Sequence, residues 1–153
     1  MFKRLILVIS ISFAAFLALP AHAEEIQLKG DVKVVRTIEE GGVSREERLP
    51  PDRVVPGDRL VFTTHFHNTS AEPANDFVVT NPLPVAVMLA KDGDFDVSVD
   101  GGQTFGRLAA LTVVDGGATP RAAVLGDVTH IRWTIPRIEP GEQGEISYFA
   151  VVR

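Results

Sequence analysis

Apolar residues recur at every second position along most of this chain, and turn-forming residues separate the runs. The clearest run spans Leu60 to Asn68, and we expect its alternate positions to face a core: Leu60, Phe62, Thr64 and Phe66. Ten Pro and 13 Gly punctuate the chain, and no window after residue 23 has convincing helical spacing. A period of two is that of a half-buried strand, so the pattern predicts an all-β chain.

The same pattern predicts about seven to nine short strands in a single domain. Besides 60–68, the candidates are residues 26–38, 77–80, 85–90, 95–99, 111–114, 122–125, 129–135 and 145–152. A break is possible at Gly30-Asp31, and residues 39–53 are expected to form a loop or a hairpin tip. Short strands separated by turns favour an antiparallel immunoglobulin-like β-sandwich.

Two turns of the same composition precede major strands. They are Pro56-Gly57-Asp58-Arg59 and Pro140-Gly141-Glu142-Gln143. Pro fixes φ at the first corner of a β-turn and Gly supplies positive φ at the second, so each turn starts a strand in a fixed direction. We expect both to be structural.

Residues 1–23 match a cleavable secretory signal peptide. The basic start, apolar centre and small-x-small end are Lys3-Arg4, residues 5–19 and Ala21-His22-Ala23. Cleavage between Ala23 and Glu24 leaves residues 24–153, a single domain of 130 residues with formal charge −7, since two of the 15 basic residues are lost. A membrane-spanning helix needs about 20 apolar residues. We therefore expect a periplasmic or secreted protein with no transmembrane anchor in its mature form.

The acidic balance and the lack of Cys exclude several classes of function. Without a Lys/Arg cluster the chain has no electrostatic footprint for nucleic acid. With no Cys, it has no disulfide, no lipid-attachment site and no thiolate for metal binding or catalysis. None of the four Ser after residue 23 lies in Gly-x-Ser-x-Gly. The sequence predicts a protein that is not an enzyme, with no catalytic residue and no cofactor.

Two sets of side chains are candidate metal ligands. His65 and His67 occupy alternate positions of one strand, so both imidazoles face the same side at a spacing that suits copper or zinc. The acidic set Asp92, Asp94, Asp96 and Asp100 has spacings that suit an irregular calcium site. An EF-hand is excluded, because Val97 and Gln103 stand where it needs Gly and Glu. For both sets the alternative is a solvated surface.

Residues 98–105 contain the pattern Ser-x-Asp-x-Gly-x-Thr-aromatic, which is similar to the Asp-box of sialidases and other β-propeller proteins. One copy in a short chain cannot build a propeller, whose blades number at least about four. We expect a self-stabilised hairpin in which the Asp100 side chain bonds turn amides, and no glycosidase activity.

The last predicted strand carries apolar residues on both faces. Its inward face would be Ile146, Tyr148, Ala150 and Val152. Phe149 and Val151 lie on the other face, where either the N-terminal segment of the same chain or a partner is expected to cover them. If this strand is a free edge, it could accept a strand from another chain.

Several of these segments together resemble the domain of unknown function 11 (DUF11) family. The resemblance rests on residues 55–62, Asn68-Thr69, residues 78–84, 129–135, 140–142 and 146–148, and it covers about residues 32–153. It implies an immunoglobulin-like sandwich in a prokaryotic envelope or surface protein without known catalytic residues. The chain departs from members in having one copy and in carrying Asn81 where they usually have Asp.

Together these observations predict a non-enzymatic exported envelope module. Its role would be protein interaction or structural assembly in the periplasm or at the cell surface, with an envelope protein or with itself. The alternative is a periplasmic protein that binds a metal or a small ligand through His65 and His67 or through residues 92–100.

Overall fold

The structure is a computed structural model that describes residues 26–114, 116 and 119–153. The predicted signal peptide, residues 1–23, and its cleavage position between Ala23 and Glu24 lie outside these residues.

The described residues form ten strands and no α-helix, so the prediction of an all-β chain is confirmed. The long strands are β1 (Ile26–Glu40), β2 (Val43–Leu49), β3 (Arg59–Asn68), β4 (Ala74–Pro82), β9 (His130–Ile138) and β10 (Gln143–Val152). The short ones are β5 (Val87–Leu89), β6 (Asp96–Ser98), β7 (Thr112–Val113) and β8 (Arg121–Ala122). Two 3₁₀ turns complete the chain, η1 (Leu108–Ala110) and η2 (Leu125–Asp127).

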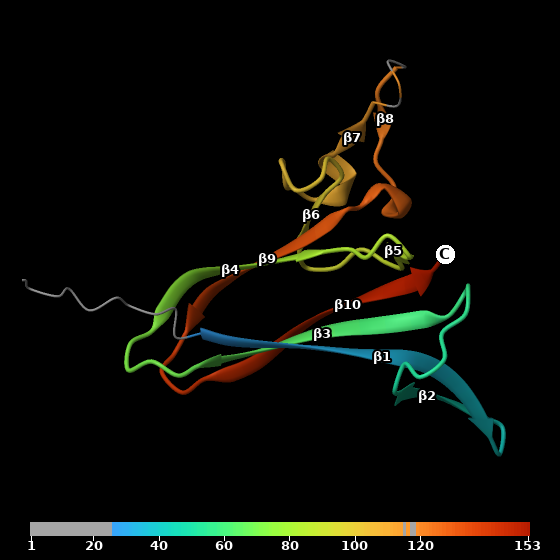
Figure 1. The fold of residues 1–153 in the computed structure, drawn as a ribbon, viewed down its shortest axis with the longest axis horizontal. Helices are drawn as coiled ribbons and strands as arrows, with labels where there is room; N and C mark the ends of the chain where they lie inside the picture. The colour runs from blue at the N-terminus through green and yellow to red at the C-terminus, as the bar shows by residue number, and fades with distance from the viewer. Residues whose placement is uncertain (1–25, 115, 117–118) are drawn as a thin grey trace, which may run out of the picture.

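Two antiparallel sheets form two layers, as Figure 1 shows. The larger has the order β2-β1-β3-β10-β5 and the smaller has the order β4-β9-β6. A separate two-stranded ribbon, β7-β8, projects from the smaller layer (Figure 1). The core between the layers contains an aromatic series in which Trp133 of β9 lies 5.5 Å from Phe95 and 6.1 Å from Tyr148 of β10, measured between ring centroids.

The order of strands in the sheets differs from that of a constant-type immunoglobulin domain. There the second strand in chain order pairs with the fifth, and the third pairs with the sixth. Here β3 pairs with the final strand, β10, and β4 pairs with β9. Sandwich domains share this two-layer architecture without always sharing connectivity.

The two Pro-Gly-acid turns close the central strand pair β3 and β10 at its opposite ends. Gly57 and Gly141 have φ of 91° and 75°, which confirms the predicted positive φ. At the first turn the Asp58 carboxylate accepts the Val55 N–H at 3.0 Å, and the Gly57 N–H donates to the carbonyl of Val152, at the end of β10. The prediction that these turns are structural therefore has a specific basis in hydrogen bonding.

The second turn repeats this arrangement on the other strand. The Glu142 carboxylate accepts the Glu139 N–H at 2.7 Å, and the Gly141 N–H donates to the carbonyl of Asn68, at the end of β3. Each turn thus starts one strand of the pair and fastens the end of the other.

Three details differ from the strand predictions. β1 continues through Gly30-Asp31 to Glu40, because it pairs with β3 along Ile26–Val35 and then with β2. The segment expected as a loop or a hairpin tip, residues 39–53, contains β2, and Gly41-Gly42 form the turn of the β1-β2 hairpin. Val61 alternates with the core positions predicted for this strand and lies on its other face, yet it is only 1% exposed.

Candidate functional site

Among the described residues, two strands that line one side of the sandwich, β1 and β4, have an edge with no partner. β2 pairs with β1 only from Val34 onward, and the rest of β1 pairs with β3 alone. We call residues 26–33 the open edge of β1. β4 is the outer strand of the smaller sheet and pairs only with β9. Within the described residues no other backbone group bonds to the open edge of β1.

A groove of about 510 Å³ is lined by residues from both strands. It also contains the stacked rings of Phe62 and Tyr148, whose centroids are 4.9 Å apart and whose planes are 2° from parallel. The remaining apolar side chains of the lining come from β1, from the end of β4 and from the segment just after it: Leu28, Val32, Pro82 and Pro84. The smaller sheet, β4-β9-β6, does not cover the inner face of β1 completely, so Leu28 is 49% exposed.

The polar groups of this groove are few and mostly engaged. The Asn81 side-chain amide donates to the Thr64 hydroxyl at 3.1 Å. Asp31 is among the lining residues, but its side chain alternates with those of Leu28 and Val32 and forms an ion pair with Lys33, on the other face of β1, at 3.6 Å. Burial raises the pKa of Tyr148 to about 12, so its hydroxyl keeps its proton at neutral pH. Such a surface suits an extended apolar segment better than a charged small molecule.

His65 and His67 lie on the outer face of β3, on the same side of the strand. The His65 Nδ1 atom is 3.5 Å from a carboxylate oxygen of Glu145 on β10. His130 lies on β9, in the other sheet. Among the described residues no group of three or more His, Asp or Glu side chains is arranged to hold a metal ion.

The four aspartates of the candidate calcium site have separate surroundings. The Asp92 carboxylate accepts its neighbour Gly93 N–H, and Asp94 lies 3.6 Å from Arg107. Asp96 is part of β6, where it pairs with Arg132 of β9. Asp100 is occupied within its own turn, as described next.

Asp100 organises the hairpin predicted from the Asp-box pattern. Its carboxylate accepts the Ser98 hydroxyl at 2.6 Å, the Thr104 hydroxyl at 2.6 Å and the backbone N–H groups of Gln103 and Thr104. These bonds, led by the one from Ser98, hold the pKa of Asp100 far below its usual range. The Arg132 guanidinium lies 3.5 Å from the centroid of the Phe105 ring and covers the hairpin. The carboxylate therefore has a structural role.

Acidification is expected to weaken this turn. The unfolded pKa of Asp is about 3.9, and the folded pKa of Asp100 is lower. The carboxylate therefore contributes its full stability above about pH 4 and loses it as pH falls through the folded pKa. We expect the Asp100→Asn protein to melt at a lower temperature than the wild type at pH 7, and the difference to shrink towards about pH 2. Melting curves at five pH values test this, and a difference independent of pH would contradict it.

Phe149 and Val151, the candidate partner surface, are half-buried on the outer face of β10. Lys91 Nζ lies 4.5 Å above the Phe149 ring, and the Arg59 guanidinium lies 5.6 Å from it. Val151 is the cross-strand neighbour of both Arg59 and Met88. The cover of Phe149 thus comes from long cationic side chains of the same chain, which bury their stems on apolar surface.

β10 itself is flanked on both sides near its end. It lies between β3 and β5, and β5 pairs with Ala150–Val152. From the sequence, we considered a free edge on β10. In the structure an edge without a partner among the described residues is on β1, along residues 26–33. The sequence predicted a strand over residues 26–38, but nothing local in it shows that the facing sheet is narrower.

Comparisons with protein-family models, with curated proteins and with solved structures give no match for this chain. In residues 26–114, 116 and 119–153 there is no helix of the length and apolarity that a membrane span requires. The candidate site thus rests on geometry alone, and it is the groove beside the open edge of β1.

Proposed function

We propose that the chain is a non-enzymatic, exported envelope module that binds another polypeptide along the groove between β1 and β4. The observation that carries this proposal is the open edge of β1 beside an apolar, aromatic-lined groove. An extended segment laid there would gain main-chain hydrogen bonds from the edge, and every second side chain would enter the groove.

The sequence supports the remaining parts of the proposal. Residues 1–23 have the features of a signal peptide, which favours a periplasmic or secreted protein. The residues shared with the domain of unknown function 11 family favour an immunoglobulin-like module of the prokaryotic envelope. Assembly through an exposed strand edge fits a structural or interaction role.

Photo-crosslinking tests the proposal at the position where it is most specific. p-Benzoylphenylalanine is placed at Leu28, which lies in the groove, or at Val85, which is 95% exposed and lies outside the groove lining. In cells that express the full chain, we expect a discrete covalent adduct from position 28 and none of the same mass from position 85. Absence of an adduct from position 28 overturns the proposal.

A further inference from the structure

The open edge of β1 carries Lys29, Asp31 and Lys33, but it lacks the backbone interruptions that protect the outer strand β4 in the described part of the chain. β2, the outer strand beyond it, is blunted by a run of charged residues, Arg45-Glu46-Glu47-Arg48. β4 is interrupted by Asp76, whose φ of 50° breaks the regular ladder, and it ends at Pro82. Charges, bulges and prolines are devices that prevent an edge from pairing. Along 26–33 there is neither a proline nor a residue with positive φ.

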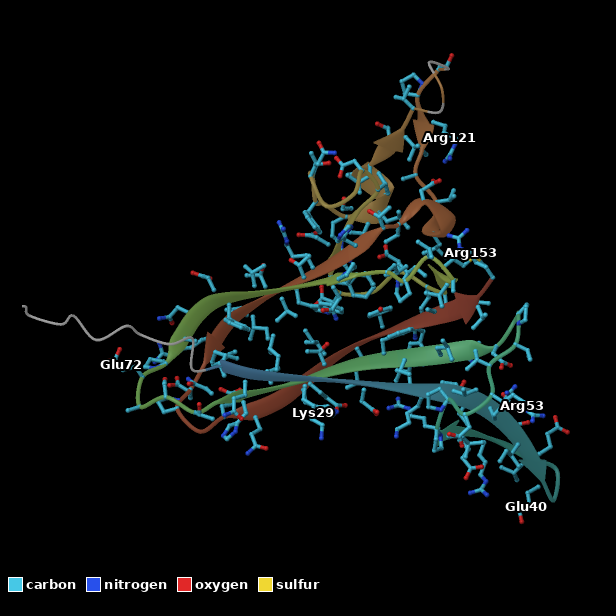
Figure 2. All side chains as sticks on the ribbon, viewed as in Figure 1. Lys29, Glu40, Arg53, Glu72, Arg121 and Arg153 are labelled. Atoms are coloured by element: carbon cyan, nitrogen blue, oxygen red, sulfur yellow. The ribbon has the colours of Figure 1, made fainter. Side chains whose placement is uncertain are left out.

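The open edge of β1 has the sequence Ile-Gln-Leu-Lys-Gly-Asp-Val-Lys. Leu28 and Val32 are on the face towards the smaller sheet, where they line the groove. Lys29 and Asp31 alternate with them and belong to the opposite face, and Figure 2 shows Lys29 projecting away from the smaller sheet. Lys29 and Asp31 are placed symmetrically about Gly30, and so are Leu28 and Val32.

We propose that the partner is a second copy of this chain, paired antiparallel through the open edge of β1 with Gly30 on the two-fold axis. In this register Lys29 lies opposite the partner's Asp31, and Leu28 lies opposite the partner's Val32. The symmetry makes each of these contacts twice. The two larger sheets become one continuous sheet, and the exposed apolar surface of Leu28 is reduced. This inference rests on the proposed function and specifies its partner.

Charge selects this register over its neighbours. Side chains alternate between the two faces of a strand. A shifted symmetric register that still keeps Leu28 and Val32 of both chains on the same face therefore moves the two-fold axis from position 30 to position 29 or 31. A centre at position 29 sets Lys29 opposite the partner's Lys29, and a centre at position 31 sets Asp31 opposite the partner's Asp31. Like charges directly opposite each other destabilise a strand pair, whereas opposite charges stabilise it.

The groove face of β1 is open at the proposed axis. A Cβ built on Gly30 meets no atom within 4 Å in the described structure, so the face that Gly30 shares with Leu28 and Val32 has free space at this position. Lys29 is exposed. The side chains of Asp31 and Lys33 form an ion pair within the chain but are still 41% and 39% exposed, so a second copy can reach them.

A charge-swap experiment distinguishes this dimer from other associations. Lys29→Asp makes both ion pairs repulsive between two identical chains, and Asp31→Lys does the same with opposite sign. We expect either change to raise the dimer dissociation constant, measured by sedimentation equilibrium, at least about tenfold. An equimolar mixture of the two variants restores opposite charges at both pairs, so it should form a heterodimer with an affinity within about threefold of the wild type.

Circular dichroism melting of each variant serves as the folding control, because residues 29 and 31 are exposed and their replacement leaves the core intact. The proposal is overturned if the wild type stays monomeric at all concentrations, or if the mixture associates no better than either variant alone. A crosslinked adduct from position 28 that contains a different protein overturns this inference and leaves the proposed function standing. The expected adduct has twice the mass of the chain.

Discussion

Replacing Trp133 with alanine is expected to lower the free energy of unfolding by about 3–5 kcal/mol. Trp133 is only 8% exposed and is packed between Phe95, in an edge-to-face contact, and Tyr148 of the opposite sheet. Truncation removes the ring that joins the two layers and leaves a cavity that the strands cannot close. Urea unfolding followed by far-ultraviolet circular dichroism measures the change, because the variant lacks the chain's one Trp as a fluorophore.

Val85→Ala is the matched control for this measurement. Val85 is 95% exposed, so its truncation should change the free energy of unfolding by less than about 0.5 kcal/mol. A Trp133→Ala protein that loses less than about 1 kcal/mol would show that the aromatic series does not hold the sheets together.

Replacing Asn68 with alanine is expected to cost about 2–4 kcal/mol. Asn68 is fully buried at the end of β3. Its amide donates to the carbonyls of Ile138, at 3.0 Å, and Glu72, at 2.9 Å, and its oxygen accepts the Ser70 N–H at 3.0 Å. Alanine leaves these backbone groups without their partner, and the one at Ile138 belongs to the other sheet. The free energy of unfolding from urea titration gives the result.

Asn75→Ala is the control, because it makes the same substitution at an exposed position. Asn75 accepts a hydrogen bond from Arg137 at 3.1 Å on the surface of β4. Water replaces that bond, so a loss below about 0.5 kcal/mol is expected. If Asn68→Ala and Asn75→Ala have equal effects, Asn68 does not join the two sheets as described.

The elements that could be predicted from the sequence are those with a local cause. The alternation in 60–68 and 129–135 predicted β3 and β9, and the two Pro-Gly-acid turns have the expected positive φ. The hairpin around Asp100 follows from side-chain hydrogen bonds between residues no more than four apart in sequence. In each case the interacting residues are neighbours in the chain.

Features that depend on pairing between distant segments could not be predicted in this way. β1 passes through Gly30-Asp31 because β3 provides partners along its whole first half. Val61 is buried although it alternates with the predicted core positions of β3. Its cross-strand neighbours are Lys33 of β1 and Phe149 of β10, and Arg59 lies over the Phe149 ring. The groove likewise arises from the different widths of the two sheets, which is a property of the strand order and not of any one strand.

The region between β6 and β9 was the least predictable. Residues 108–126 gave one clear strand candidate, at 111–114, and a weaker one at 122–125. The structure has two-residue strands there, β7 and β8, in a ribbon with exposed Val114 and Val124. With so few residues buried, periodicity carries little information.

The central claim is that the open edge of β1 is where this chain meets another polypeptide. The most direct measurement is the comparison of photo-crosslinking from position 28 with that from position 85, carried out on the full chain in the cells that express it. The account predicts a discrete adduct from Leu28 that is absent from Val85 and that is lost when Val32→Glu is introduced beside it in the groove. Equal crosslinking from both positions, or an adduct that survives Val32→Glu, would contradict it.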